Sequence, residues 1–129
     1  MEGGEKWARY SFLGSDPLMV FTAKGNRLTI RHADGRTEQV GTDNPLEGLR
    51  GLLSRFKPVP VPGLPRFQGG AVGFFSYDIV RHVERLPRLA KDDLRLPDAV
   101  FMLTDSLLVF DNLKHRLLVI ANAHIEATD

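Results

Sequence analysis

Two aromatic residues flank an arginine near the start of the chain, just before a short apolar stretch. The residues that could contact a ligand there are Trp7, Arg9, Tyr10 and Ser11. An arginine can hold a carboxylate through two parallel hydrogen bonds, and aromatic rings can enclose a flat apolar group. An amino acid such as tryptophan combines both features. The alternative is an edge strand with an arginine on its surface, and the residues taken alone favour that alternative.

A histidine and a glutamate with one residue between them, His82 and Glu84, are the strongest candidates for acid–base catalysis. A neutral histidine can act as a general base when a carboxylate orients it. The segment around them is predicted to be helical, and helical residues two positions apart do not face each other. We therefore expect no catalytic residue here, and we expect Asp78 to form an ion pair with Arg81.

The histidines and glycines lack the spacing of a metal or phosphate site. The four histidines are scattered at positions 32, 82, 115 and 124, without a paired ligand spacing. Gly69, Gly70 and Gly73 are not followed by the Gly-Lys-Ser/Thr that a phosphate loop requires. We expect Gly69 and Gly70 to let the backbone bend or approach another strand. We expect the acidic pair Asp92 and Asp93 to be a solvated surface.

The composition narrows the class of protein. The chain has 129 residues, which fits one domain, and 43% of them are hydrophobic, which is enough for a core. Seventeen basic and sixteen acidic residues give a net charge of +1, so no basic field favours nucleic acid or an anionic membrane. The absence of cysteine and of any long apolar run or signal peptide favours a cytoplasmic protein.

The first third of the chain has the pattern of a β-meander. Strands are predicted over 10–13 and 18–23, and the pair Gly25-Asn26 predicts a tight hairpin, since both residues tolerate positive φ. The pair Asp34-Gly35 is the one that a type I′ turn requires. Apolar and polar residues alternate between these turns, as in a sheet with one solvated face. We therefore predict a meander across residues 9–41.

The periodicity then changes to that of a helix. Apolar residues recur at three- and four-residue spacing, at Leu46, Leu49, Leu52, Leu53 and Phe56. Asn44 can cap this helix, Pro45 suits its first position, and Glu47 completes a start that resembles a capping box. Gly48 and Gly51 each weaken the helix by about 1 kcal/mol relative to alanine. Close packing onto the sheet would compensate for that loss.

The rest of the chain is predicted to be an extended connector followed by strands. Prolines dominate residues 58–65 and exclude both a helix and an inner strand. A buried strand is predicted over 72–77, leading into a short helix that Asp78 caps. Further strands are predicted over 99–103, 107–110 and 116–122, with a turn at 111–114.

Two of these strands are apolar on both faces, over residues 107–110 and 117–120. Such strands require a partner layer on each side. We expect the chain to form a two-fold dimer, with one residue of Leu108/Val109 and one of Leu118/Val119 pointing outward. The competing expectation is that helix 45–56 covers one face and that the short helix after Asp78 covers the other.

Two segments, Tyr10–Gly14 and Gly69–Pro87, resemble the N-terminal domain shared by anthranilate synthase component I and 4-amino-4-deoxychorismate synthase component I. The strands, the Asp34-Gly35 turn, the leucine-rich helix and the proline connector follow in that family's order, so the resemblance covers essentially the whole chain. The run 77–87 is more similar to the anthranilate branch. The resemblance implies an α+β fold, a mostly antiparallel sheet with few helices, which is part of a larger sandwich in the full enzyme.

The resemblance implies a non-catalytic single domain, residues 1–129, that lacks the C-terminal domain of such enzymes. In the family, the C-terminal domain binds chorismate and Mg²⁺, and a glutaminase subunit supplies ammonia. The whole enzyme converts chorismate and ammonia or glutamine to anthranilate and pyruvate. We therefore expect no catalytic residue, no metal and no cofactor in this chain, and we expect the C-terminal domain and the glutaminase subunit as partners of the full enzyme.

The resemblance also places part of a tryptophan site for feedback inhibition on Trp7, Arg9, Tyr10 and Ser11. The family's Leu-Leu-Glu-Ser segment and the C-terminal part of that pocket are missing, so a half-site should bind tryptophan weakly or not at all. Two alternatives stay open. One is the aminodeoxychorismate synthase counterpart of folate biosynthesis, in which bound tryptophan is structural. The other is a free-standing interaction module that docks through strands 107–110 and 117–120.

Overall fold

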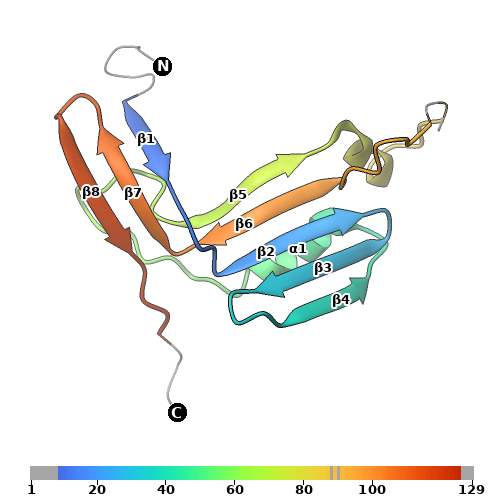
Figure 1. Ribbon diagram of the computed structural model, residues 1–129, viewed down its shortest axis with the longest axis horizontal. Coiled ribbons are helices and arrows are strands. Elements are labelled where there is room, and N and C mark those ends of the chain that lie inside the picture. Colours follow the sequence, from blue (N-terminus) through green and yellow to red (C-terminus); the bar gives the residue numbers. More distant parts are fainter. Residues whose placement is uncertain (1–8, 88, 90, 126–129) are drawn as a thin grey trace.

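The computed structural model describes residues 9–87, 89 and 91–125. Within these ranges the chain forms eight strands and two short helices in an elongated molecule, with two sheets side by side (Figure 1). The strands are β1 (Tyr10–Leu13), β2 (Met19–Lys24), β3 (Arg27–His32), β4 (Thr37–Gly41), β5 (Gly70–Phe75), β6 (Ala99–Thr104), β7 (Ser106–Asp111) and β8 (Arg116–Ala121). The helices are α1 (Pro45–Leu53) and the 3-10 helix η1 (Tyr77–His82).

Both sheets are antiparallel throughout, which confirms the predicted α+β class with few helices. The larger sheet has five strands in the order β4-β3-β2-β6-β5, and the smaller has three in the order β1-β7-β8. The predicted meander holds for β2, β3 and β4 but is wrong for β1, which pairs with β7 in the other sheet. The chain bends between β1 and β2, where Asp16 adopts a positive φ of 50°, so β1 leaves the plane of the meander.

The two predicted hairpin turns differ in length. Gly25 has a φ of +53° in a two-residue loop that pairs Lys24 with Arg27, as expected. The β3–β4 loop is not a type I′ turn, because it contains a third residue. The amide of His32 donates to the carbonyl of Arg36 at 2.9 Å, and only Gly35 of the pair has positive φ, at +87°. This is the three-residue hairpin in which glycine provides the left-handed position.

Helix α1 begins as predicted at Asn44, whose side chain accepts a hydrogen bond of 3.0 Å from the amide of Leu46. The capping box is wrong, because the Asn44 amide donates to the hydroxyl of Thr42 at 3.2 Å. Glu47 instead forms an ion pair of 3.1 Å with Arg50 on the helix surface. A threonine before the cap therefore does what the glutamate was expected to do.

Strand β5 is an edge strand and not the buried strand that was predicted. It pairs only with β6, and Val72, Phe74 and Phe75 remain 44%, 51% and 43% exposed. Val72 and Phe74 share a face of the sheet with Met102 of the inner strand β6, which is also 43% exposed, so this face is uncovered among the described residues. Gly73 faces the backbone of Val100 so closely that a side chain would collide with it.

The short helix η1 starts after Ser76 without a side-chain cap, so the expected capping by Asp78 is wrong. Asp78 instead accepts a hydrogen bond of 2.7 Å from Nε of Arg81, which confirms the predicted ion pair. The same arginine donates to the carbonyls of Leu86 and Pro87 at 3.0 and 2.8 Å. The side chain of Arg81 thereby ties the helix to the chain that follows it.

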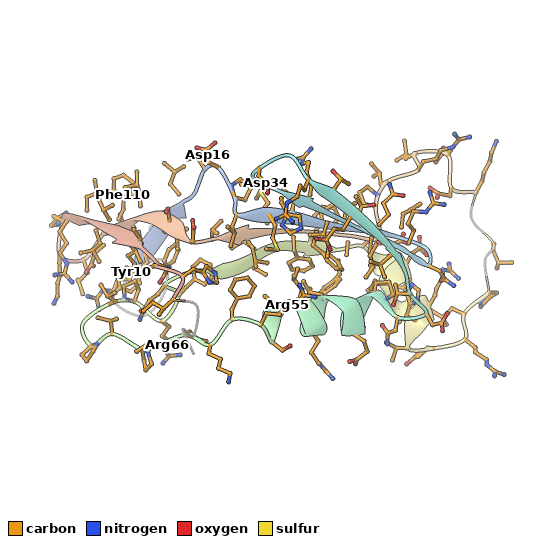
Figure 2. The ribbon with its side chains drawn as sticks, turned by 90° about the horizontal axis from the view of Figure 1, so that it is seen from below. Tyr10, Asp16, Asp34, Arg55, Arg66 and Phe110 are labelled. Atoms are coloured by element: carbon orange, nitrogen blue, oxygen red, sulfur yellow. The ribbon has the colours of Figure 1, made fainter. Side chains whose placement is uncertain are left out.

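The helix and the proline connector lie on one side of the two sheets (Figures 1 and 2). Leu49 and Leu52 of α1 pack into a core on the five-stranded sheet, and Leu64 and Phe67 of the connector pack against a second core on the three-stranded sheet. Neither helix covers the 107–110 and 117–120 strands, so the expectation that two helices close these faces is wrong. No helix in the described part of the chain is long and apolar enough to cross a membrane.

Candidate functional site

The residues proposed to hold a ligand lie at the start of β1, at the outer end of the three-stranded sheet. Arg9 immediately precedes this strand, and Tyr10 and Ser11 are its first two residues. Trp7 lies outside the described residues. Strand β1 is anchored to β7, because Tyr10 is paired with Asp111 and the amide of Asn112 donates to the carbonyl of Arg9 at 2.8 Å.

Arg9 forms a bidentate ion pair with Asp111. Its Nε donates to Oδ1 and its Nη2 donates to Oδ2, each at 3.0 Å. The Asp111 side chain has no exposed surface, whereas that of Arg9 is 27% exposed. Two parallel charge-assisted hydrogen bonds are the geometry that was expected between Arg9 and a ligand carboxylate. Within this chain, a carboxylate of the protein occupies that place.

Asp111 receives further donors from the β7–β8 turn. The amide of Lys114 donates to its Oδ1 at 3.2 Å, and Nε of Arg116 lies 3.5 Å from its Oδ2. The hydrogen bond from Arg9 is the main reason that the pKa of Asp111 lies well below its ordinary value of 3.8, and Lys114 and Arg116 add to the effect. The carboxylate is therefore charged throughout the neutral range, and it joins β1, β7 and β8.

Arg9 also contacts an aromatic ring of its own chain. The guanidinium carbon of Arg9 lies 4.8 Å from the centroid of the Tyr10 ring, within the range of a cation–π contact. Tyr10 is 6.2 Å from Phe12, and Phe12 meets Phe67 edge-on at 5.4 Å. These rings extend from Arg9 across the covered side of the small sheet to the connector. Figure 2 shows Tyr10 on the same side of the sheets as the connector residue Arg66.

Ser11 lies on the opposite side of the strand from Tyr10, because neighbouring strand residues alternate between faces. It is paired with Phe110, which Figure 2 shows on the side away from Tyr10. Its hydroxyl accepts a hydrogen bond of 3.4 Å from the Asn112 side chain. The structure thus brings Arg9 and Tyr10 together, adds Asp111, and separates Ser11 from both.

The other candidate residues have structural partners. His82 contacts the carbonyl of Asp43 at 3.2 Å, and Asp92 forms an exposed ion pair of 2.6 Å with Lys24. Gly69 has a φ of +150°, and a side chain there would come within 2.7 Å of the Asn122 amide, so its role is in the backbone as predicted. No cluster of three or more potential metal ligands occurs among the residues that the structure describes.

The whole chain, residues 1–129, matches the family of chorismate binding enzymes. It is 46% identical over 125 residues to anthranilate synthase component 1 of Acetivibrio thermocellus, covering 97% of this chain and 25% of that protein. The identity to the Saccharomyces cerevisiae protein of the same name is 44% over 122 residues, covering 93% of this chain and 22% of the yeast protein.

A solved structure of a protein with the same name is also similar to this chain. The chain superposes on anthranilate synthase component I of Streptococcus pneumoniae with a TM-score of 0.71 and 28% identity, covering 95% of this chain and 28% of that one. The chain therefore spans about a quarter of the length of the proteins that it matches.

Proposed function

The chain belongs to the chorismate binding enzyme family, and from this premise we propose that it is the N-terminal domain of an anthranilate synthase component I. The observation that carries the proposal is the 46% identity to such a protein over 125 residues. The antiparallel fold and the TM-score of 0.71 to a second anthranilate synthase component I support it independently of the sequence. The S. cerevisiae relative bears the same name, which favours the anthranilate branch over its aminodeoxychorismate counterpart.

In this proposal residues 1–129 form one domain, and the chemistry belongs to the longer enzyme. That enzyme would convert chorismate and ammonia or glutamine to anthranilate and pyruvate, with a glutaminase subunit as the source of ammonia. Chorismate and Mg²⁺ would bind to the C-terminal part. The domain described here would serve regulation and assembly.

The regulatory role would be part of a tryptophan site at the start of β1, formed with Trp7, Arg9, Tyr10 and Ser11. The ion pair with Asp111 supports an indirect role for Arg9. The guanidinium group of Arg9 is hydrogen-bonded to Asp111, so a ligand carboxylate would have to compete with a buried, fully charged carboxylate. Arg9 would then be a positioning residue that holds Tyr10 and the start of β1 in place for the inhibitor.

The test uses an extended protein, in which this chain continues into the part of the A. thermocellus relative that follows the matched region. Anthranilate formation from chorismate and ammonia is measured as tryptophan is added. Arg9→Ala should raise the tryptophan concentration for half-inhibition roughly 10–100-fold, with kcat little changed, because an ordered charge-assisted contact is lost. Arg36→Ala, which removes an exposed arginine paired with Asp34, should leave the inhibition unchanged.

Asp111→Asn distinguishes the indirect role from direct contact. If Arg9 positions β1, this variant weakens inhibition as Arg9→Ala does, because both break the same pair. If Arg9 binds the inhibitor itself, freeing it from Asp111 preserves or strengthens inhibition. An unchanged inhibition curve for both variants would contradict a role of this corner in tryptophan binding.

A further inference from the structure

One dipeptide of the chain has a sequence at which a protein backbone rearranges readily. Asp34 is followed by Gly35, and no other aspartate or asparagine in the chain precedes a glycine. In such a pair the amide nitrogen of the glycine can attack the side-chain carboxyl group of the aspartate. Glycine favours the attack because it has no side chain to hinder the approach and its backbone rotates freely. The product of the rearrangement is isoaspartate.

The reaction has two steps, and its only co-reactant is water. In the first step a bond forms between the nitrogen of Gly35 and Cγ of Asp34. The hydroxyl of the neutral carboxyl group leaves with the amide proton as water, and a succinimide ring remains. In the second step water attacks the main-chain carbonyl of the ring, and the bond from that carbon to the nitrogen breaks. The chain then runs through the side chain of residue 34, which lengthens the backbone by one carbon.

The dipeptide lies in the loop between β3 and β4, where the surroundings leave room for ring closure. Strand β4 is an edge strand of the five-stranded sheet, and all its residues are exposed (Figure 1). The Asp34 side chain is 53% exposed. Gly35 has a positive φ, and a Cβ added there would meet nothing within 4 Å. Water therefore has access to the reacting atoms.

Arg36 holds the carboxylate of Asp34 in a form that reacts slowly. Its backbone amide donates to Oδ1 at 2.9 Å and its Nε donates to Oδ2 at 2.6 Å, so both carboxylate oxygens accept a hydrogen bond. The hydrogen bond from the Arg36 side chain is the main reason that the pKa of Asp34 lies below its ordinary value of 3.8. An ionised carboxylate resists attack, because its charge repels the electron pair of the nitrogen and an oxide ion is a poor leaving group.

The attacking nitrogen is also engaged in a hydrogen bond. The amide of Gly35 donates to the carbonyl of His32 at 3.0 Å, and the amide of His32 donates to the carbonyl of Arg36 at 2.9 Å. The amide of Ala33 donates to the carbonyl of Leu18 at 3.0 Å, which fixes the loop to the residue before β2. Ring closure requires the Gly35 amide to leave its acceptor and turn toward Cγ, so an ordered loop slows the reaction.

From these observations we propose that Asp34 is a site of isoaspartate formation and that Arg36 is the residue that suppresses the reaction in the folded chain. The loop combines the one Asp–Gly pair with an exposed position, and Arg36 is the residue that engages its carboxylate. Exposed ion pairs are weak, so the suppression is incomplete. The proposal requires neither tryptophan binding nor catalysis, and it stands or falls separately from the proposed function.

The rearranged loop would no longer fit the β3–β4 hairpin. The two strands are joined beside the loop by the hydrogen bond from His32 to Arg36, and one extra backbone carbon changes the separation and direction of the loop ends. The side chains of His32 and Glu38, which are 2.8 Å apart, link the same two strands next to the loop. Isoaspartate at residue 34 should therefore open the turn end of this hairpin.

The test incubates the 129-residue chain and its variants at neutral pH. Isoaspartate is measured at each aspartate by peptide mass spectrometry with electron-transfer fragmentation. In the wild type it should accumulate at residue 34 before any other aspartate. Arg36→Ala should accelerate the reaction roughly 3–10-fold, because a charge-assisted hydrogen bond to the reacting group is lost. Arg50→Ala, which removes an exposed arginine paired with Glu47, should react at the wild-type rate.

Hydrogen exchange separates the effect of Arg36 on the carboxylate from a general loosening of the loop. The amides of His32 and Gly35 are hydrogen-bonded within the loop, so their exchange reports whether it stays closed. The expected result for Arg36→Ala is a faster reaction with unchanged exchange of both amides. An unchanged reaction rate, or a faster rate with equally faster exchange, would overturn the role of Arg36. An absence of isoaspartate at residue 34, or its earlier appearance at another aspartate, would overturn the site.

Discussion

At the scale of single residues, the corner of Arg9 and Asp111 contains the one buried charged side chain among the residues that the structure describes. A carboxylate without exposed surface is stabilised there by a bidentate arginine, a backbone amide and a second arginine. Breaking a buried pair on one side leaves the other charge without compensation, which is more destabilising than losing an exposed ion pair. The corner should therefore contribute to stability whether or not a ligand binds beside it.

Asp111→Asn should lower the Tm of the chain by roughly 5–10 °C. The neutral amide cannot balance the positive charges of two arginines, and its NH₂ group would point at N–H groups that are themselves donors. Asp92→Asn is the matched control, since Asp92 pairs with Lys24 on an exposed surface. Its effect on Tm should stay within about 2 °C. Thermal unfolding followed by circular dichroism measures both. Equal effects would mean that Asp111 behaves as a surface residue.

Asp111 should also make the stability depend on acid pH. Its pKa is lower in the folded chain than its ordinary value of 3.8, so the unfolded state binds the proton more readily. Its contribution is therefore complete above about pH 5 and is lost as the pH falls below about 4. The Tm of the wild type should fall more steeply between pH 5 and pH 2.5 than that of Asp111→Asn. Parallel curves for the two proteins would contradict this linkage.

At the scale of elements, helix α1 shows how a residue that is unfavourable for a helix can be required by packing. A methyl group at Gly48 would collide with Cδ1 of Leu28, which is only 5% exposed in the sheet below. At Gly51 nothing lies within 4 Å of the same position. The close packing expected to compensate for both glycines is therefore confirmed for Gly48 and wrong for Gly51.

The two glycines should respond oppositely to alanine. Gly51→Ala should stabilise the chain by about 0.5–1 kcal/mol, the difference in helix propensity. Gly48→Ala gains the same propensity but overpacks Leu28, which costs about 1–3 kcal/mol, so a net loss of about 1 kcal/mol is expected. Urea unfolding of both variants provides the comparison. If both variants were stabilised, Leu28 would have room to move.

Local sequence signals predicted the elements better than their partners. The Gly25-Asn26 turn, the Asn44 cap and the strands over 99–121 follow from a few neighbouring residues, and the structure confirms them. The assignment of β1 to the small sheet and of β5 to an edge depends on pairing between distant segments. Alternation of apolar residues shows that a strand exists but not which neighbour it joins.

The same limit applies to the candidate site. The sequence could indicate that Arg9 is suited to bind a carboxylate, which was expected to come from a ligand, and in the structure Arg9 binds a carboxylate of the chain itself. It could not indicate Asp111, because the two residues are separated by 102 positions and meet only through the β1–β7 register. The available signal was an aspartate that ends an apolar strand and would be buried alone without a cation.

At the scale of the whole molecule, the helix and the connector lie on one side of the two sheets and complete both cores there. Apolar side chains are exposed on both sides, with Phe12, Val40 and Phe75 on that side and Met102, Phe110, Leu117 and Val119 on the other.

The isolated chain should form no anthranilate from chorismate with ammonia or glutamine, because in our proposal the substrate and Mg²⁺ bind to the part outside it. The A. thermocellus relative, assayed under the same conditions with ammonia and Mg²⁺, is the positive control. Fluorescence of the product gives the rate. Measurable anthranilate formation by the pure 129-residue chain would overturn the assignment of the chemistry to the remaining part.

The passage of β6 into β7 through Asp105 has a consequence for how the domain opens. Both are inner strands of their sheets, β6 between β2 and β5 and β7 between β1 and β8. Asn122 stabilises the junction at Asp105. Its backbone amide and its side-chain amide both donate to the Asp105 carbonyl, at 2.8 and 2.9 Å. Displacement of either inner strand from its core would therefore also strain the other core. The two cores should therefore exchange their amide hydrogens as one cooperative unit. A destabilised three-stranded sheet should then also exchange faster beneath helix α1.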